Sequence, residues 1–328
     1  MTTLGQATPS PPAISSGSRG RMLFVLSLLF AALAVLPLGL SRYQLGLATE
    51  MLIYGTLAMS IDILAGFAGR TSLAHGAIFG VSAYVVVYVI STLNLSPVLA
   101  IALGVSAATL LAALFALIAV RTSGVYFLLI TLALGMIIWG ICLRWTDVTG
   151  GENGLRGDLR VGILRDPRAF YWITLAVSGL LSLAMWRLVR SPFGLTLRGI
   201  RDSESRMRSL GYNVQAHLFV GFVVSGFFAG AAGVLYAFFN SFVSPTTVAL
   251  AQSVQGLLMA ITGGIGTLFG SFIGSAAILT LQNVVSSYTE RWQTALGLTF
   301  ILVMIFAPHG LVGLLRSVLP SQALRAGQ

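Results

Sequence analysis

An arginine-rich stretch interrupts a chain that otherwise consists of long apolar runs. This stretch, residues 190–211, is called the arginine loop below, and it contains Arg190, Arg198, Arg201, Arg206 and Arg208. Each arginine at the centre of a bilayer costs about 2.5–3.5 kcal/mol or more, so the arginine loop cannot lie in the hydrocarbon. Because loops rich in arginine remain in the cytoplasm, the sequence predicts a solvated cytoplasmic loop between two membrane spans.

The composition predicts a membrane protein. Hydrophobic residues make up 56% of the chain, charged residues only 9%, and the mean hydropathy is +0.92. Soluble domains carry about 25% charged residues, so we expect an all-α polytopic membrane helix bundle embedded in a lipid bilayer. The net charge of +10 follows from arginines that flank apolar runs, and no basic stretch is interleaved with aromatic residues. We therefore expect no nucleic-acid partner.

Apolar runs of sufficient length predict about 8–10 spans, one of them interrupted by glycines. The uninterrupted candidates are 22–40, 46–65, 72–91, 97–120, 125–143, 170–189, 214–239 and 295–315. The run at 22–40 exceeds the apolar core of a signal peptide, so we expect a retained first span. We expect a disordered cytoplasmic tail over 1–20, a transmembrane domain over 21–316 and a cytoplasmic tail over 317–328.

Successive spans cross the membrane in opposite directions, so a cytoplasmic arginine loop fixes the expected side of every other loop. Counting backward places Arg121, Arg70 and the N-terminus in the cytoplasm, and the C-terminus follows. The same count places residues 144–169 outside. That external loop carries five arginines and four acidic residues, so it is nearly neutral, as the positive-inside bias requires.

Two glycine-rich stretches predict either a substrate path or close helix packing. The segment 252–285 contains a short apolar run and then Gly263, Gly264, Gly266 and Gly270. The stretch in the first half contains Gly66, Gly69, Ser72, His75, Gly76 and Gly80. Interrupted segments at corresponding places in two halves can mark a transport path, so these ten residues are our candidate path residues. Tight packing of an ordinary helix pair is the alternative.

Motifs for catalysis, metal binding or nucleotide binding are absent from the sequence. The chain has a single cysteine, Cys142, and three widely separated histidines, so no metal or cofactor is expected. Glu50 and Asp62 lie in one apolar run and are either functional acids or solvated and paired acids. We favour the second interpretation, with Arg70 as the partner of Asp62.

The arginine loop also has the pattern of a surface helix. Pro192 suits a first helical turn, and residues 195–210 can wind about four turns. The apolar positions at helical spacing are Leu197, Ile200, Met207 and Leu210. Such a helix either lies on the membrane surface or fills a groove in a partner.

Five motifs, in order along the chain, closely resemble the permease subunits of branched-chain amino acid ABC importers. The first comprises Gly66, Gly69, Ser72, Leu73, His75, Gly76, Ala77, Phe79, Gly80, Ala83 and Tyr84. The arginine loop supplies Ser191, Pro192, Phe193, Gly194, Leu197, Arg198, Ile200, Arg201, Asp202, Glu204, Leu210 and Gly211. The others are Gly263 to Thr267, the turn Thr149 to Gly151 with Gly154 and Leu155, and Ala307, Pro308, Gly310 and Leu311.

The long external loop is similar to that of the second permease type of this family. The chain departs from the family pattern at Ala74 and Ser82, where glycine is usual, and over residues 205–209, where alanines are usual.

The resemblance implies a set of partners and a location. A permease of this kind pairs with a second, homologous permease in the bacterial inner membrane. Two cytoplasmic ATPase subunits bind below, and a periplasmic substrate-binding protein delivers substrate from above. The chain then acts as a transport subunit without an ATPase site of its own. The expected ATPase-coupling residues are Arg198, Arg201, Asp202, Glu204, Leu210 and Gly211.

Other functions stay open at this point. The same architecture serves urea, short amides or aromatic carboxylates as cargo. A secondary transporter or channel working alone is disfavoured by the large arginine loop and the lack of a buried acid–base relay. A membrane-embedded enzyme is disfavoured by the lack of any catalytic set.

Overall fold

The computed structural model describes residues 39–288, together with Pro37, Thr294, Gly297, Leu298, Ile301 and residues 310–313. Residues 1–40 and 41–328 form separate units, and everything below concerns the second. The expected spans 22–40 and 295–315 and both expected tails therefore lie largely or wholly outside the described residues.

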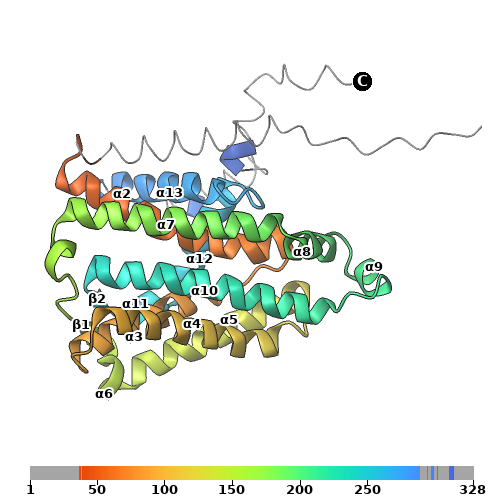
Figure 1. Ribbon diagram of the computed structural model, residues 1–328, viewed down its shortest axis with the longest axis horizontal. Helices are drawn as coiled ribbons and strands as arrows, with labels where there is room; N and C mark the ends of the chain where they lie inside the picture. The colour runs from red at the N-terminus through yellow and green to blue at the C-terminus, as the bar shows by residue number, and fades with distance from the viewer. Residues whose placement is uncertain are drawn as a thin grey trace, which may run out of the picture. The chain divides into compact units, whose positions relative to one another are not determined.

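The described part of the chain is helical almost throughout (Figure 1). The first elements are α2 (Arg42–Asp62), η2 (Ile63–Ala68), α3 (His75–Ser91), α4 (Pro97–Ala119) and α5 (Gly124–Arg144). The loop after α5 holds α6 (Thr146–Thr149), η3 (Gly151–Asn153), β1 (Leu155–Arg156) and η4 (Gly162–Arg165). Next come α7 (Pro167–Arg190), α8 (Pro192–Asp202), α9 (Glu204–Ser209) and α10 (Val214–Asn240). The last are β2 (Phe242–Val243), α11 (Pro245–Val248), α12 (Leu250–Gly263) and α13 (Gly270–Ser286).

Side chains at the helix starts explain several of these boundaries. The Ser41 hydroxyl accepts from the Gln44 backbone N–H while the Gln44 side chain accepts from Ser41, which forms a capping box. Ser96 and Asp166 accept from backbone N–H groups in the first turns of α4 and α7, and each is followed by proline. Proline suits this place because the first helical N–H groups have no partner within the helix.

The helix α2 lies at the centre of the bundle. It packs against α7, α10, α12 and α13. Of the residues in the most apolar stretch of α2 with η2, 89% are buried. In the most apolar stretch of α5 only 22% of the residues are buried, so α5 lies at the periphery of the bundle. By length and composition, α2 with η2, α4, α5, α7 and α10 are candidate membrane spans, and α3 and α13 are shorter apolar helices. The expected all-α polytopic membrane bundle is confirmed.

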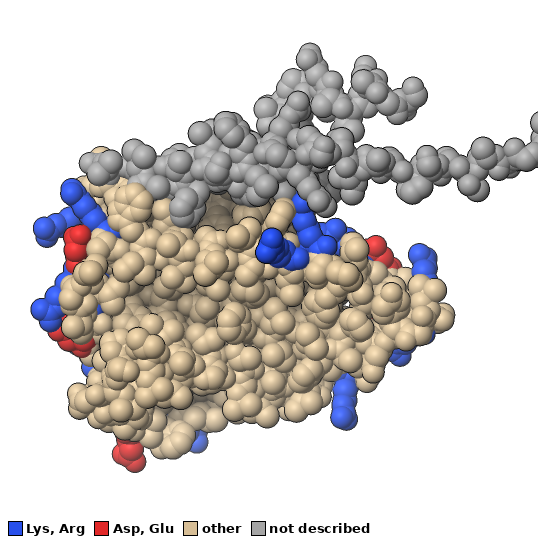
Figure 2. All heavy atoms as spheres, in the orientation of Figure 1, with Lys and Arg blue, Asp and Glu red and all other residues tan. Residues whose placement is uncertain are grey.

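Loops that the sequence places on one side of the membrane meet at the same end of the bundle. Arg70 contacts both Thr122 and Glu204, which joins three loops at the end where α8 and α9 lie (Figure 1). At the opposite end, β1 pairs antiparallel with β2 through Leu155 and Val243. Figure 2 shows arginines and acidic residues mainly toward the two ends of the face in view, with uncharged surface between them.

Two expected elements differ from the structure in an informative way. The single helix expected over residues 195–210 is wrong, because the backbone becomes extended at Ser203 and divides it into α8 and α9. The Ser203 hydroxyl then caps α9 by accepting from the Arg206 N–H. The glycine interruption of 252–285 is confirmed, since α12 ends at Gly263 and α13 begins at Gly270.

We expect impermeant thiol reagents to distinguish the two ends in whole cells. Asn153→Cys should be labelled from outside, because residue 153 is exposed in the external loop. Ser205→Cys, which is exposed in α9, should be labelled only after the cells are opened. The native Cys142 is buried and should stay unreactive. Labelling of Ser205→Cys but not Asn153→Cys in intact cells would reverse the topology.

Candidate functional site

The carboxylate of Asp62 holds a loop between α12 and α13. Residues 264–269 form this loop, called the glycine loop below. Asp62 ends α2, is fully buried, and accepts from the backbone N–H of Gly266 at 2.6 Å and of Leu268 at 3.0 Å. These two backbone donors satisfy the carboxylate, which forms no ion pair within the described part of the chain. The expected pairing of Asp62 with Arg70 is therefore wrong.

Positive φ angles give the glycine loop its shape. Gly264 has φ +117° and Gly266 has φ +80°, values that L side chains rarely adopt. Leu268 adopts φ +55° although it has a side chain, and its N–H is one of the two that Asp62 binds. An ideal Cβ on Gly266 would meet no atom closer than 3.7 Å, so glycine is required there by conformation and not by space.

Gly66 lies where α2 and the glycine loop meet. It belongs to the π-helical turn η2, and an ideal Cβ there would lie against the Asp62 carboxylate and the Gly266 backbone nitrogen. Its carbonyl accepts from Nη1 of Arg201 at 2.5 Å. Gly69, at φ +68°, lies under the same arginine, with its ideal Cβ position 2.6 Å from Arg201 Cγ. One arginine of the arginine loop thus covers both glycines.

A second contact ties the arginine loop to the end of α2. Arg70 donates to Glu204 at 2.8 Å and to the Thr122 carbonyl at 2.9 Å, and its side chain is 8% exposed. Glu204 also accepts from Arg208 at 3.1 Å. The Arg198 guanidinium lies 4.9 Å from the centre of the Phe67 ring. Arg198, Arg201 and Glu204 therefore form an inner face that anchors the arginine loop.

The remaining coupling candidates lie on the outer face of the arginine loop. Leu210 is 66% exposed, although the helical pattern groups it with the buried Leu197 and Ile200. Gly211 has φ +86° and open space around its ideal Cβ position. Asp202 is exposed and faces Arg201 at 3.5 Å. The six predicted residues thus divide into anchoring and exposed groups.

The other path candidates of the first half pack α3 against α10, α11 and α12. His75 is fully buried with Nε2 2.7 Å from Ser225 Oγ, and Ser225 donates to the Ser60 carbonyl. Because Ser225 has a single proton, Nε2 of His75 is the donor in this pair. The Gly76 N–H donates to Ser253 Oγ at 2.8 Å.

Glycine also permits close approach further along the same helices. An ideal Cβ on Gly80 would meet Val248 and the Thr247 carbonyl. Ser72 is buried and its hydroxyl accepts from the Ala74 N–H at 3.2 Å. Gly263 and Gly270 face each other, since a Cβ on either would contact the other's carbonyl. These glycines let helix backbones touch, as the packing interpretation expects.

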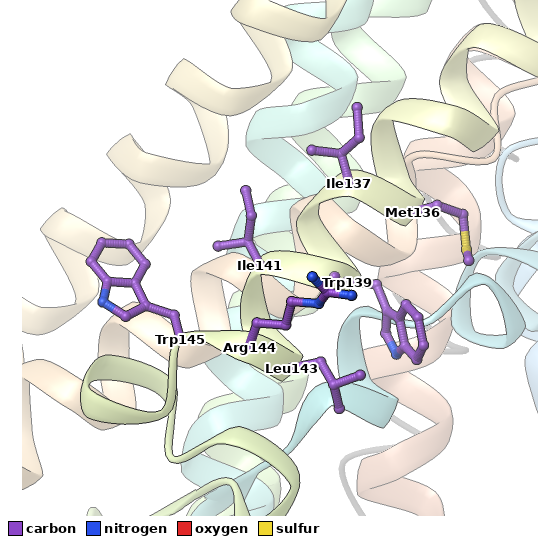
Figure 3. Close-up of a pocket in the computed structure, with 8 residues that line it drawn as sticks. Met136, Ile137, Trp139, Ile141, Leu143, Arg144 and Trp145 are labelled. Atoms are coloured by element: carbon purple, nitrogen blue, oxygen red, sulfur yellow. The ribbon is translucent and has the colours of Figure 1, made fainter.

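The residues described by the structure include no group of three or more His, Cys, Asp or Glu able to hold a metal ion. An open depression of about 850 Å³ lies along α5, and its lining includes Met136, Trp139, Arg144 and Trp145 (Figure 3). Every lining residue belongs to α5 or directly follows it, so the depression is a helix surface and not an enclosed site.

Several partners in this network were not found from the sequence. Phe67, Thr122, Ser225 and Ser253 contact candidate residues from elements far away in the chain. Neither charge nor spacing marks them, because only the tertiary fold brings η2, α10, α12 and the α4–α5 connection to the site.

We expect Gly66→Ala to destabilise the protein by about 1–3 kcal/mol, because the added methyl group presses on the Asp62 carboxylate and the Gly266 backbone. Gly46→Ala in α2, which leads directly into η2, is the matched control, since nothing lies within 4 Å of its ideal Cβ position. Thermal unfolding of the purified protein in detergent should show a lower midpoint for Gly66→Ala only. Equal midpoints for the two variants would contradict the close contact.

Comparison with known proteins identifies relatives over most of the chain. A family model for the permease component of branched-chain amino acid transport systems matches residues 43–308. The high-affinity branched-chain amino acid permease LivM of Salmonella typhimurium is 28% identical, over 97% of this chain and 80% of its own length. LivM of Escherichia coli is 26% identical over 93% and 78%, and LivH of Salmonella typhimurium is 25% identical over 79% and 91%.

No solved structure matches the chain. The family match covers well over half of the sequence and includes Asp62, the arginine loop and the glycine loop. The chain is therefore a multi-pass membrane protein that belongs to the permease component family of branched-chain amino acid transport systems.

Proposed function

We propose that this protein is a transmembrane subunit of an ABC importer that moves branched-chain or related amino acids across the bacterial inner membrane. ATP hydrolysis on two cytoplasmic ATPase subunits drives the movement, and a periplasmic binding protein supplies the substrate. A second, homologous permease completes the path. The family membership supports the transport role, and the similarity to both LivM and LivH supports a pair of related permeases.

The contacts of the arginine loop are the main support for coupling between the ATPase subunits and the substrate path. The arginine loop has an inner face bound to the end of α2 and an exposed outer face, at the end of the bundle that we expect in the cytoplasm. A partner that moves the outer face therefore also moves Arg201, whose guanidinium is bound to the Gly66 carbonyl. Gly66 touches Gly266, so the movement reaches the glycine loop without an intervening flexible segment.

The outer face has the chemistry of a docking surface for the ATPase. Leu195, Leu210 and Tyr212 are 59%, 66% and 44% exposed on a segment that also carries exposed arginines. Apolar side chains surrounded by charges are typical of the centre and rim of protein interfaces. We propose Leu210 and Gly211 as contact residues and Asp202 as part of the rim.

We propose the glycine loop as a gate on the cytoplasmic half of the substrate path. It joins α12, only 14 residues long, to α13, with 17 residues, and each is shorter than a full span. Shortened helices that meet at glycines are common beside transport paths. The packing glycines of α3 then set how closely α11 and α12 approach, and with it the width of the path.

The experiment that tests this function is reconstitution of the permease pair with its ATPases and binding protein in proteoliposomes. Leu210→Asp should weaken ATPase co-purification about tenfold or more, because the new carboxylate is unpaired in an apolar contact. Leu93→Asp makes the same change at an exposed leucine of the opposite end and should leave co-purification unchanged.

Two outcomes would contradict the proposal. A parent complex that takes up no amino acid in the presence of ATP and loaded binding protein would exclude the importer function. Normal ATPase binding by Leu210→Asp would exclude the outer face of the arginine loop as the docking surface.

A further inference from the structure

Four polar side chains from three helices meet away from the glycine loop. Glu50 and Tyr54 are one turn apart on α2, Tyr236 is on α10 and Gln252 is on α12, and we call them the tyrosine cluster. The Gln252 amide and the Tyr54 hydroxyl are hydrogen-bonded at 2.9 Å. The two tyrosine rings meet edge to face with centres 6.2 Å apart. Glu50 lies one helical turn before Tyr54, on the same helix.

The buried part of the tyrosine cluster has more hydrogen-bond donors than it uses. Tyr54 is 6% exposed and Gln252 is 8% exposed. Together they have three polar hydrogens, two on the amide and one on the hydroxyl, and their mutual bond uses one of them whichever way the amide is turned. Among the contacts of the described residues, the other two have no acceptor. Unused buried donors are costly, so this place favours an acceptor such as a carboxylate.

Glu50, by contrast, is an acceptor that has no donor among the residues that the structure describes. It is partly buried, and it makes no ion pair or hydrogen bond within the described part of the chain. An acid inside an apolar span is costly unless it faces water, a cation or a ligand. Glu50 therefore lacks a positive partner among the described residues.

We propose that the tyrosine cluster binds the zwitterionic end of an α-amino acid on its way through the protein. The ammonium group pairs with Glu50, and the carboxylate accepts from the unused donors of Tyr54 and Gln252. This inference rests on the importer function proposed above and assigns residues to substrate recognition. Glu50 lies 12 residues before Asp62 on α2, about 18 Å nearer the external end. A substrate entering from outside thus meets the tyrosine cluster before it reaches the glycine loop.

The test measures uptake and ATP hydrolysis separately in proteoliposomes that contain the complete importer. Glu50→Gln removes the charge but keeps the shape, and Tyr54→Phe removes the hydroxyl but keeps the ring. Glu50→Gln should lower amino-acid uptake about tenfold or more, and Tyr54→Phe several-fold, while hydrolysis stimulated by the binding protein stays within about twofold of the parent. A merely structural role would not separate the two rates.

Matched controls make the same chemical changes at exposed positions. Glu152→Gln changes an exposed acid of the external loop, and Tyr126→Phe changes a tyrosine that is 73% exposed on α5. Both should take up substrate as the parent does.

The outcomes separate this inference from the proposed function. A parent complex without ATP-driven uptake overturns both. An active parent with normal uptake by Glu50→Gln and Tyr54→Phe overturns the tyrosine cluster alone. Parallel loss of uptake and hydrolysis in Tyr54→Phe also overturns it, because the cluster would then support the fold and not the substrate. If the importer that contains Glu50→Gln does not assemble, the uptake and hydrolysis rates of Tyr54→Phe decide between these outcomes.

Discussion

The Asp62 carboxylate organises the end of the bundle where the arginine loop lies. A buried carboxylate is tolerated only when hydrogen bonds replace its lost hydration. Here the replacement comes from two N–H groups of a loop that must adopt left-handed backbone angles to present them. The glycines at 264 and 266 and the close approach of Gly66 follow from this single requirement. The end of α2 and the α12–α13 hairpin therefore behave as one mechanical unit.

The arginine loop is attached to the bundle by its charged side chains and also by Leu197 and Ile200, which are buried in the hydrophobic core. Arg201 binds a backbone carbonyl beside Asp62, and Arg70 binds Glu204 in a half-buried ion pair. Both contacts are charge-assisted and directional, so they set the orientation of the arginine loop on this unit. The exposed leucines on the other side stay available to a partner.

Sequence patterns predicted the elements well because membrane spans depend on local composition. The bounds of α4, α5, α7 and α10 lie within about three residues of the expected spans, since hydrophobic length and capping residues are local signals. The break at Ser203 was missed because its extended backbone interrupts a run that keeps its helical apolar spacing. The partner of Asp62 was missed because a backbone N–H leaves no mark in a sequence.

The glycines illustrate the same limit. From the sequence we expected these glycines either to line a substrate path or to allow close helix packing. That they line a path is still a proposal. The structure distinguishes their local reasons, however. At Gly66 a side chain would collide with neighbouring atoms, and at Gly266 the backbone has a positive φ angle. At Gly76 and Gly80 the missing side chain lets helices approach closely. Sequence alone does not separate these reasons, because each depends on a neighbour far along the chain.

The ratio of substrate transported to ATP hydrolysed tests whether the arginine loop acts on the glycine loop through Arg201. Arg201→Gln removes the link between the arginine loop and the Gly66 carbonyl while leaving the exposed leucines for the ATPase. We expect the variant complex to assemble and hydrolyse ATP but to transport much less substrate per ATP. The control Arg187→Gln, at an exposed arginine near the end of α7, should keep the parent ratio. An unchanged ratio in Arg201→Gln would show that the arginine loop does not act through the glycine loop.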